Sequence, residues 1–183
     1  MGMVRMDIRN IVVSNGPIPS AIILKPHSTD GDDSRAEVLP INVGVVESSS
    51  IGAGIEHRRR ARPMTHDLFL DVLDKLGARL ESVSITSVEG PTFKASLTLT
   101  DADGRTTSVD SRPSDAMALA VRRDAPILVD ERVLSTAAVP DFDSIRKEER
   151  DHELAEFHDF LESISPEDFV AASQGGGTGD TKA

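Results

Sequence analysis

Two short stretches of the chain each combine an arginine, a proline and, within a few residues, a carboxylate. They are RPMTHD at residues 62–67 and RPSDA at residues 112–116. Each stands before an apolar run of helical character, and proline suits the first turn of a helix because the amide it lacks would have no partner there. The sequence therefore predicts two similar helix N-termini, and exposed amides at such ends can bind phosphate.

The residue types in and around these stretches are those that phosphodiester hydrolysis requires. The reaction needs an activated water, stabilisation of the charge that develops on the phosphoryl oxygens, and assistance to the leaving oxygen. The predicted catalytic residues are His66, Asp67, Asp115 and Glu47. The predicted phosphate-binding residues are Arg62, Arg112, Ser114, Arg58, Arg59 and Arg60.

A divalent cation is a further expectation for this set. Carboxylates suit Mg²⁺ or Mn²⁺, so Asp67 and Asp115, with Glu47 nearby in the pattern, are the candidate metal ligands. The sequence has no cysteine and no HxH, HExxH or multi-histidine spacing, so a tight zinc site is not expected.

The same residues also have a structural interpretation, which the sequence leaves open. Carboxylates in the first turn, such as Asp67 and Asp115, stabilise a helix by interacting with its dipole. Arg112 can pair with Asp115 or Asp110, and Arg62 with Asp67, because structural ion pairs use the same residue types as active sites.

Charge is distributed unevenly along the chain. The formal net charge is -11, but residues 141–183 carry 4 Lys/Arg against 12 Asp/Glu, which leaves 16 against 19 for residues 1–140. Residues 1–140, the body of the chain, are therefore close to neutral. They contain one dense basic run, HRRRAR at residues 57–62, which is either a local cationic surface or a solvated loop.

Composition limits the class of protein and the mode of binding. A chain of 183 residues is long enough for one domain with its own core, and the absence of cysteine is consistent with a reducing compartment. The first residues, MGMVRMDIRNIVV, resemble neither a signal peptide nor a membrane span, so we expect a cytoplasmic protein. Because aromatic residues are few, contacts with nucleic acid should be mainly to its backbone, with low specificity and strong salt dependence.

The elements that must position these residues follow from hydrophobic periodicity. Strands are predicted from Val4 to Val13, at 21–25 and at 37–47, the first two joined by the Asn15-Gly16-Pro17 turn. A short helix is predicted at 47–56.

The second half of the body begins with the clearest helix. From Thr65, which could cap it, the helix places Leu68, Val72, Leu76 and Leu80 at four-residue intervals on its apolar face, with Phe69 and Leu73 beside them. The stretches at 81–89, 92–100 and 105–111 predict an antiparallel meander. A helix at 113–125, a strand at 126–130 and a helical turn within 130–139 complete the body.

These elements predict an α+β fold with a mixed, largely antiparallel sheet and packed helices. The compact domain is expected to span residues 1–140. Residues 141–172 are expected to form an acidic helical extension, in which HELAEFHDFLESI at 152–164 is amphipathic, and residues 173–183 a flexible tail.

Four blocks of sequence resemble the bifunctional nuclease domain family, which is also described as a bacterial domain of unknown function. They are LPINVGVVESSSI, RPMTHDLFLDVLDKLGARLESVSI, TFKASLTL and VDSRPSDAMALAVRRDAPILV, in matching order and spacing. The resemblance covers roughly residues 4–135, and the segment FHDFLESISPEDF resembles an extension of bacterial members. It implies a compact α+β fold, self-association with a dimer expected, and nuclease activity on DNA and RNA of the kind described for plant relatives.

Three functional hypotheses follow. The first is a nuclease that cuts DNA and RNA with little sequence preference, with the basic run 57–62 guiding the strand. The second is a non-catalytic oligomeric module that binds a protein, RNA or a small anionic ligand. The third is an interaction scaffold that works through the C-terminal helix, with no membrane involved in any of the three.

Overall fold

The structure is a computed structural model that describes residues 2–14, 16, 19–28, 37–57, 61–141 and 154–155. The chain divides into two units, Met1–Pro140 and Asp141–Ala183, and all elements named below belong to the first. Arg58, Arg59 and Arg60 lie outside the described residues, as do the tail 173–183 and the helix predicted at 152–164 apart from residues 154–155. The functional analysis therefore concerns the first unit.

An eight-stranded mixed sheet forms the centre of this unit, in the order β6-β5-β4-β7-β1-β2-β3-β8. Its strands are β1 (Met3–Val12), β2 (Ser20–Pro26), β3 (Glu37–Val43), β4 (Arg79–Glu89), β5 (Thr92–Thr100), β6 (Thr106–Ser111), β7 (Ile127–Asp130) and β8 (Val139–Pro140). Among the described strand pairs, β4 and β7 run parallel and the others antiparallel. The predicted α+β class with a mixed, largely antiparallel sheet is confirmed.

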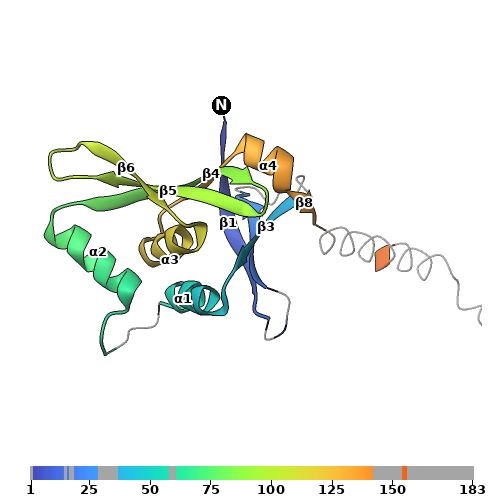
Figure 1. Cartoon of the computed structure of the whole chain (residues 1–183), viewed down its shortest axis with the longest axis horizontal. Helices are drawn as coiled ribbons and strands as arrows, with labels where there is room; N and C mark the ends of the chain where they lie inside the picture. The colour runs from blue at the N-terminus through green and yellow to red at the C-terminus, as the bar shows by residue number, and fades with distance from the viewer. Residues whose placement is uncertain are drawn as a thin grey trace, which may run out of the picture. The chain divides into compact units, whose positions relative to one another are not determined.

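The helices are α1 (Val45–Ile55), α2 (Thr65–Lys75), α3 (Pro113–Arg123) and α4 (Glu131–Ala137). Because a parallel strand pair needs a crossover, α3 carries the chain between the meander and β7. It contacts α1, α2, β4 and β5, and Figure 1 shows α1, α2 and α3 gathered together with α4 apart from them. Within the described ranges, no helix is both long and apolar enough to cross a membrane.

The core lies between the sheet and this group of helices. Strands contribute alternate side chains, because successive residues of a strand point to opposite faces. The helix α3 buries five consecutive residues, Ala116 to Ala120, and this is possible because small side chains let neighbouring elements approach on several sides. The largest fully buried side chains are Met6, Ile22, Leu24, Leu39, Ile41, Ile51, Ile85 and Met117.

Most predicted elements are confirmed. The hairpin of β1 and β2, the meander of β4, β5 and β6, the helix α3 and the strand β7 stand where periodicity placed them. The strand predicted at 37–47 ends at Val43, because Gly44 begins α1 as its N-cap. The helix predicted at 47–56 thus starts two residues earlier.

The helix α2 differs from its prediction in two respects. It ends at Lys75, and Gly77 follows in the left-handed conformation with a φ of 69°, so Leu80 belongs to β4. Thr65 is its first residue instead of its cap: Met64 is the N-cap, and the Asp67 carboxylate accepts a hydrogen bond from the Met64 N–H.

The predicted apolar face of α2 is also largely exposed. Leu70 and Leu73 are the buried residues of this helix, whereas Leu68, Val72 and Leu76 are 54%, 46% and 72% exposed. The four-residue spacing identified the helix correctly and its buried side wrongly, because a stripe of leucines does not determine which neighbour the helix meets.

The close approach of α1 to α3 depends on Gly54. A Cβ atom at Gly54 would lie 2.6 Å from the Arg122 Nη1 atom and 2.6 Å from the Val121 Cγ2 atom. Both distances are well inside van der Waals contact, so any larger side chain there would force the helices apart. Gly52, two residues earlier in α1, has ordinary space, with Ile11 Cδ1 at 3.8 Å from such an atom.

We expect Gly54→Ala to lower the free energy of unfolding by about 1 to 3 kcal/mol, because overpacking displaces buried neighbours. Gly52→Ala is the matched control, and it should leave stability unchanged or raise it by up to about 1 kcal/mol, since alanine has the higher helix propensity. Urea unfolding followed by circular dichroism measures both. Equal effects of the two substitutions would contradict the close approach at Gly54.

Candidate functional site

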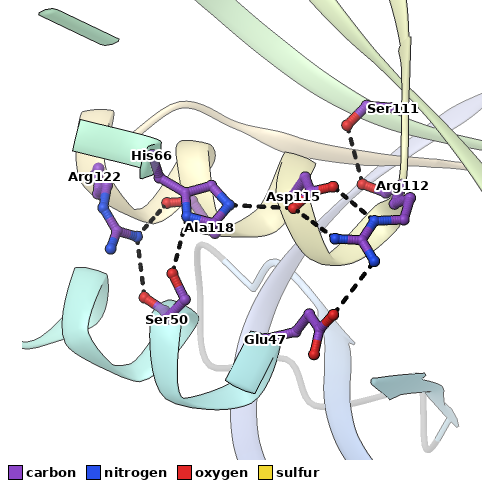
Figure 2. A network of polar contacts seen from close by, with 8 residues as sticks. All are labelled: Glu47, Ser50, His66, Ser111, Arg112, Asp115, Ala118 and Arg122. Atoms are coloured by element: carbon purple, nitrogen blue, oxygen red, sulfur yellow. Dashed lines mark hydrogen bonds and ion pairs between the residues drawn. The ribbon is translucent and has the colours of Figure 1, made fainter. Parts of the chain in front are cut away.

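His66 joins the three helices α1, α2 and α3 at the centre of a polar cluster (Figure 2). Its Nδ1 atom lies 3.0 Å from the Ser50 Oγ atom on α1. Its Nε2 atom lies 3.2 Å from the Asp115 Oδ1 atom on α3. The imidazole is therefore held at both nitrogens by groups that come from different helices.

Asp115 fixes which nitrogen of His66 carries a proton. Hydrogen bonds from Arg112 lower the pKa of Asp115, burial opposes the shift, and the hydrogen bond from His66 adds to the lowering. At neutral pH the Asp115 carboxylate is therefore ionised and can only accept. It follows that His66 donates to Asp115 through Nε2–H, while its Nδ1 atom faces the Ser50 hydroxyl.

Arg112, the N-cap of α3, holds Asp115 with a two-pronged contact. The Nε atom lies 2.8 Å from Asp115 Oδ2, and the Nη2 atom lies 3.2 Å from Asp115 Oδ1. Its Nη1 atom is 3.3 Å from Glu47 Oε1 on α1. The described residues thus use three of the five guanidinium donors, and the side chain is 66% exposed, which leaves donors for a ligand.

Glu47 can reach Arg112 because Gly44 has no side chain. A Cβ atom at Gly44 would lie 2.2 Å from the Glu47 Oε2 atom, so the carboxylate occupies the space of the missing side chain. Glu47, Arg112 and the buried Ser114 line one wall of a hollow of about 280 Å³. This places four predicted site residues, His66, Asp115, Arg112 and Glu47, in one connected network with Ser114 adjacent.

Asp67 belongs to a second group, built around Arg122. The Arg122 side chain is 9% exposed, and its Nε atom lies 2.7 Å from Asp67 Oδ1. Its Nη1 atom donates to the carbonyl oxygens of Ser50 and Ala118, at 3.1 and 2.7 Å. Burial alone would raise the pKa of Asp67, but the Met64 N–H and the Arg122 guanidinium outweigh it and lower that pKa.

The two groups meet at Ser50, whose hydroxyl binds His66 and whose carbonyl binds Arg122 (Figure 2). The predicted pairing of Arg112 with Asp115 is confirmed, whereas Asp67 pairs with Arg122 and not with Arg62. Arg62 lines a separate hollow of about 620 Å³ together with Asp67 and Arg122.

Sequence reasoning missed Ser50 and Arg122. A signal for Arg122 was present, because Arg122 follows Asp115 by seven residues and so lies on the same side of α3. Ser50 stands in a run of three serines that gives no indication of which hydroxyl faces a histidine. Its side chain is buried, so it orients His66 and is not accessible to a polymer.

The donor set does not fit a preformed divalent-cation site. Among the described residues, no group of three or more His, Asp or Glu side chains has metal-binding geometry. Both Asp67 oxygens and both Asp115 oxygens accept hydrogen bonds from nitrogen donors. Arginines, His66 and the Met64 N–H thus bind these carboxylate oxygens, and a metal on Asp67 or Asp115 stays a prediction.

Chemically, the cluster combines a proton-transfer pair with an exposed cation. The ionised Asp115 carboxylate can accept a proton, and the hydrogen bond from His66 holds that carboxylate in position. Arg112 supplies fixed positive charge beside that pair, where an oxyanion can be stabilised.

We expect Asp115→Asn to reduce the acid sensitivity of folding. A carboxyl whose pKa is lowered by folding contributes stability above its ordinary pKa of 3.8, and this is lost as the pH falls through the lower folded-state value. The difference in unfolding free energy between wild type and variant should therefore be largest near neutral pH and shrink below pH 3.8. Urea titrations across this range measure it.

Asp110→Asn is the matched control, since Asp110 is an exposed carboxylate on β6 that is outside the His66 network. The free energy of unfolding of Asp110→Asn should follow that of the wild type at each pH. A difference between wild type and Asp115→Asn that stays constant down to strongly acid pH would contradict the ion pair.

Comparison with known proteins places the cluster in a family context. A family model described as the bifunctional nuclease domain matches residues 30–141, which include every residue of both polar groups. An uncharacterized protein of Mycobacterium tuberculosis is 37% identical over 137 residues, which cover 73% of this chain and 81% of the relative.

Plant relatives carry the name bifunctional nuclease. Bifunctional nuclease 2 of Arabidopsis thaliana is 32% identical over 114 residues, or 61% of this chain and 33% of the relative. Bifunctional nuclease 2 of Oryza sativa is 34% identical over 100 residues, or 54% of this chain and 31% of the relative. The matched region is therefore about a third of each plant protein. On the extent of the family match, the chain belongs to the bifunctional nuclease domain family.

Proposed function

We propose that the domain hydrolyses phosphodiester bonds of DNA and RNA with little sequence preference, at the cluster of His66, Asp115, Arg112 and Glu47. The observation that carries the proposal is the continuous hydrogen-bonded line from Ser50 through His66 and Asp115 to the exposed Arg112. Membership of a nuclease family supports it. Family membership alone does not transfer chemistry, so the argument rests on what these side chains can do.

Arg112 binds the phosphate in this proposal. Asp115 and Glu47 use three of its five donors, and a guanidinium can match two phosphoryl oxygens with parallel hydrogen bonds. The two carboxylates hold the guanidinium in place before substrate arrives. The group that stabilises the developing negative charge is therefore oriented in advance, which is the condition for efficient electrostatic catalysis.

The pair of His66 and Asp115 transfers the proton. An attacking water loses its proton to the ionised Asp115 carboxylate, which His66 and Arg112 hold in place, as the new bond to phosphorus forms. The pair then returns a proton to the leaving oxygen as the old bond breaks, so the protonation state is restored after each turnover. Ser50 keeps the imidazole in the required orientation.

Asp67 has a positioning role in this scheme. Both its carboxylate oxygens are engaged, one by Arg122 and one by the Met64 N–H at the start of α2. These contacts fix the first turn of α2, the turn that carries His66. The expected substrate contact therefore belongs to Asp115 and Arg112, and loss of Asp67 acts through the position of the imidazole.

The remaining expectations accompany this proposal. The partner is nucleic acid bound through its backbone, the protein self-associates with a dimer expected, and the compartment is the cytoplasm. Light scattering measures whether the protein self-associates as a dimer. Cleavage assays in the presence of Mg²⁺, Mn²⁺ or EDTA test whether the activity depends on a divalent cation.

A second candidate function is a non-catalytic module that binds RNA, a protein or a small anion. The observation that favours it is that the carboxylates of both groups already form ion pairs with arginines, as a purely structural network would. Such a module retains binding through Arg112 without cleavage, so the same purified protein distinguishes the two functions.

The decisive experiment is cleavage of labelled single-stranded DNA and RNA by highly purified protein. We expect His66→Ala and Asp115→Asn each to reduce the rate by at least about a hundredfold, the ordinary contribution of general acid–base catalysis. Asp67→Asn should reduce it less, because it acts through position. The variants are prepared identically and their folding is verified by circular dichroism.

His27→Ala serves as the matched control, since His27 pairs with Asp7 on the β1–β2 hairpin and is not part of the His66 cluster. It should cleave at the wild-type rate. Equal cleavage by wild type and all variants would contradict this site, and binding without cleavage in the wild type would favour the second function.

Salt dependence tests the mode of binding. We expect the affinity for a single-stranded oligonucleotide to fall steeply with salt, because counterions are released when phosphates are neutralised. Arg112→Ala should lower the slope of log affinity against log salt by about one unit. Arg105→Ala, which removes an exposed arginine paired with Asp103, should leave that slope unchanged. Fluorescence anisotropy measures both, and an unchanged slope in Arg112→Ala would contradict a phosphate contact.

A further inference from the structure

The hollow beside Arg112 is lined by residues of two chemical kinds. The polar residues include Glu47 and Arg112, which form an ion pair, and Ser114. The apolar residues include Phe93 near the start of β5, Pro91 and Ile41. The group proposed to hold phosphate and an aromatic side chain thus line the same hollow.

Phe93 lies near one end of the apolar face of its strand. Ala95 and Leu97, on the same face of β5, are buried, whereas Phe93 and Leu99 are partly buried, and of these two Phe93 lines the hollow. An aromatic ring that lines an open hollow presents a flat apolar surface to whatever enters. Phe93 packs against the hydrophobic core and also lines the hollow.

Asn42, an exposed residue of β3, lines the same hollow. A side-chain amide offers both donors and an acceptor, which is the combination that reads the polar edge of a planar heterocycle. The lining therefore supplies an aromatic face, an amide and a guanidinium within one small space.

We propose that this hollow binds one nucleobase of a single-stranded nucleic acid, on the nucleotide whose phosphate contacts Arg112. The inference rests on the proposed function and adds a base subsite to it. Stacking on aromatic rings and on arginine planes is the usual way in which proteins hold unpaired bases. The volume of about 280 Å³ lies at the lower limit of ligand pockets, which suits a single base and not a larger group.

The geometry also determines the form of nucleic acid. A base that enters a hollow has to leave its stack and its pairing partner, and this costs free energy in a duplex. The subsite therefore favours single strands. It also creates a modest preference among bases at one position, although the contacts to the rest of the strand are to its backbone.

The test is the affinity of the wild-type protein for the four nucleoside 5′- and 3′-monophosphates and for ribose 5-phosphate, measured by isothermal titration calorimetry. The nucleotides should bind at least about tenfold more tightly, since stacking of one base contributes on that order. Equal affinity for nucleotides and ribose 5-phosphate, including no binding of either, would overturn the proposal.

Two variants locate the effect. Phe93→Leu keeps an apolar side chain of similar size, so it should remain folded while reducing the preference for nucleotides over ribose 5-phosphate to about threefold or less. Asn42→Ala removes an exposed amide and should reduce the differences in binding affinity among nucleotides that carry the four bases. If Phe93→Leu lowers the unfolding temperature strongly, the differences in affinity among the four nucleotides in Asn42→Ala decide the test.

The matched control is Phe69→Leu, which changes an exposed phenylalanine on α2 that does not line this hollow. It should bind every ligand as the wild type does. Two results together would overturn the subsite: Phe93→Leu prefers nucleotides over ribose 5-phosphate as strongly as the wild type does, and Asn42→Ala shows the same differences in affinity among the four nucleotides. The base would then bind elsewhere.

Failure of the subsite and failure of the nuclease proposal give different results. Cleavage that depends on His66 but shows no nucleotide preference overturns the subsite and leaves the nuclease intact. Preference for nucleotides that depends on Phe93, in a protein that does not cleave, supports the subsite and identifies a binding module. Arg112→Ala should weaken the binding of nucleotides and of ribose 5-phosphate by the same factor, since both ligands carry the phosphate.

Discussion

The buried guanidinium of Arg122 is the contact on which the arrangement of the three helices depends. A buried charge is stable only when its donors are satisfied, and here the Asp67 carboxylate and the carbonyl oxygens of Ser50 and Ala118 do this. These acceptors belong to α2, α1 and α3. One side chain therefore fixes the relative positions of the helices that carry His66, Ser50 and Asp115, and Gly54 provides the space that this guanidinium occupies.

The candidate site is a consequence of that arrangement. His66 touches groups from two other helices, so its orientation is only as precise as the helix packing around Arg122. Arg112 is different, because it is the N-cap of α3 and is mostly exposed, held by two carboxylates at the protein surface. The cluster thus pairs a half-buried, firmly held imidazole with an exposed cation, and a phosphate needs both precision and access.

Much of the fold follows from local patterns. Alternation predicted the hairpin and the meander, and proline before an apolar run predicted the starts of α2 and α3. The buried side of α2 could not be predicted in this way. Leu68, Val72 and Leu76 form a good apolar stripe, yet Leu70 and Leu73 meet the body, because the direction of burial is set by where α3 and β4 lie.

The order and spacing of the sequence blocks were enough to identify the family and to suggest candidate site residues. The paired arginine, proline and carboxylate motifs singled out His66, Asp67, Arg112 and Asp115, because these residue types suit both a phosphate site and a helix N-terminus. Only the tertiary structure decided which carboxylate meets which arginine. Asp67 and Asp115 look equivalent in sequence, but Asp115 faces His66 and Arg112 while Asp67 pairs with the buried Arg122. The physical reason is that an ion pair forms between groups brought together by packing, and the partners of Asp67 and His66 are 55 and 49 residues away.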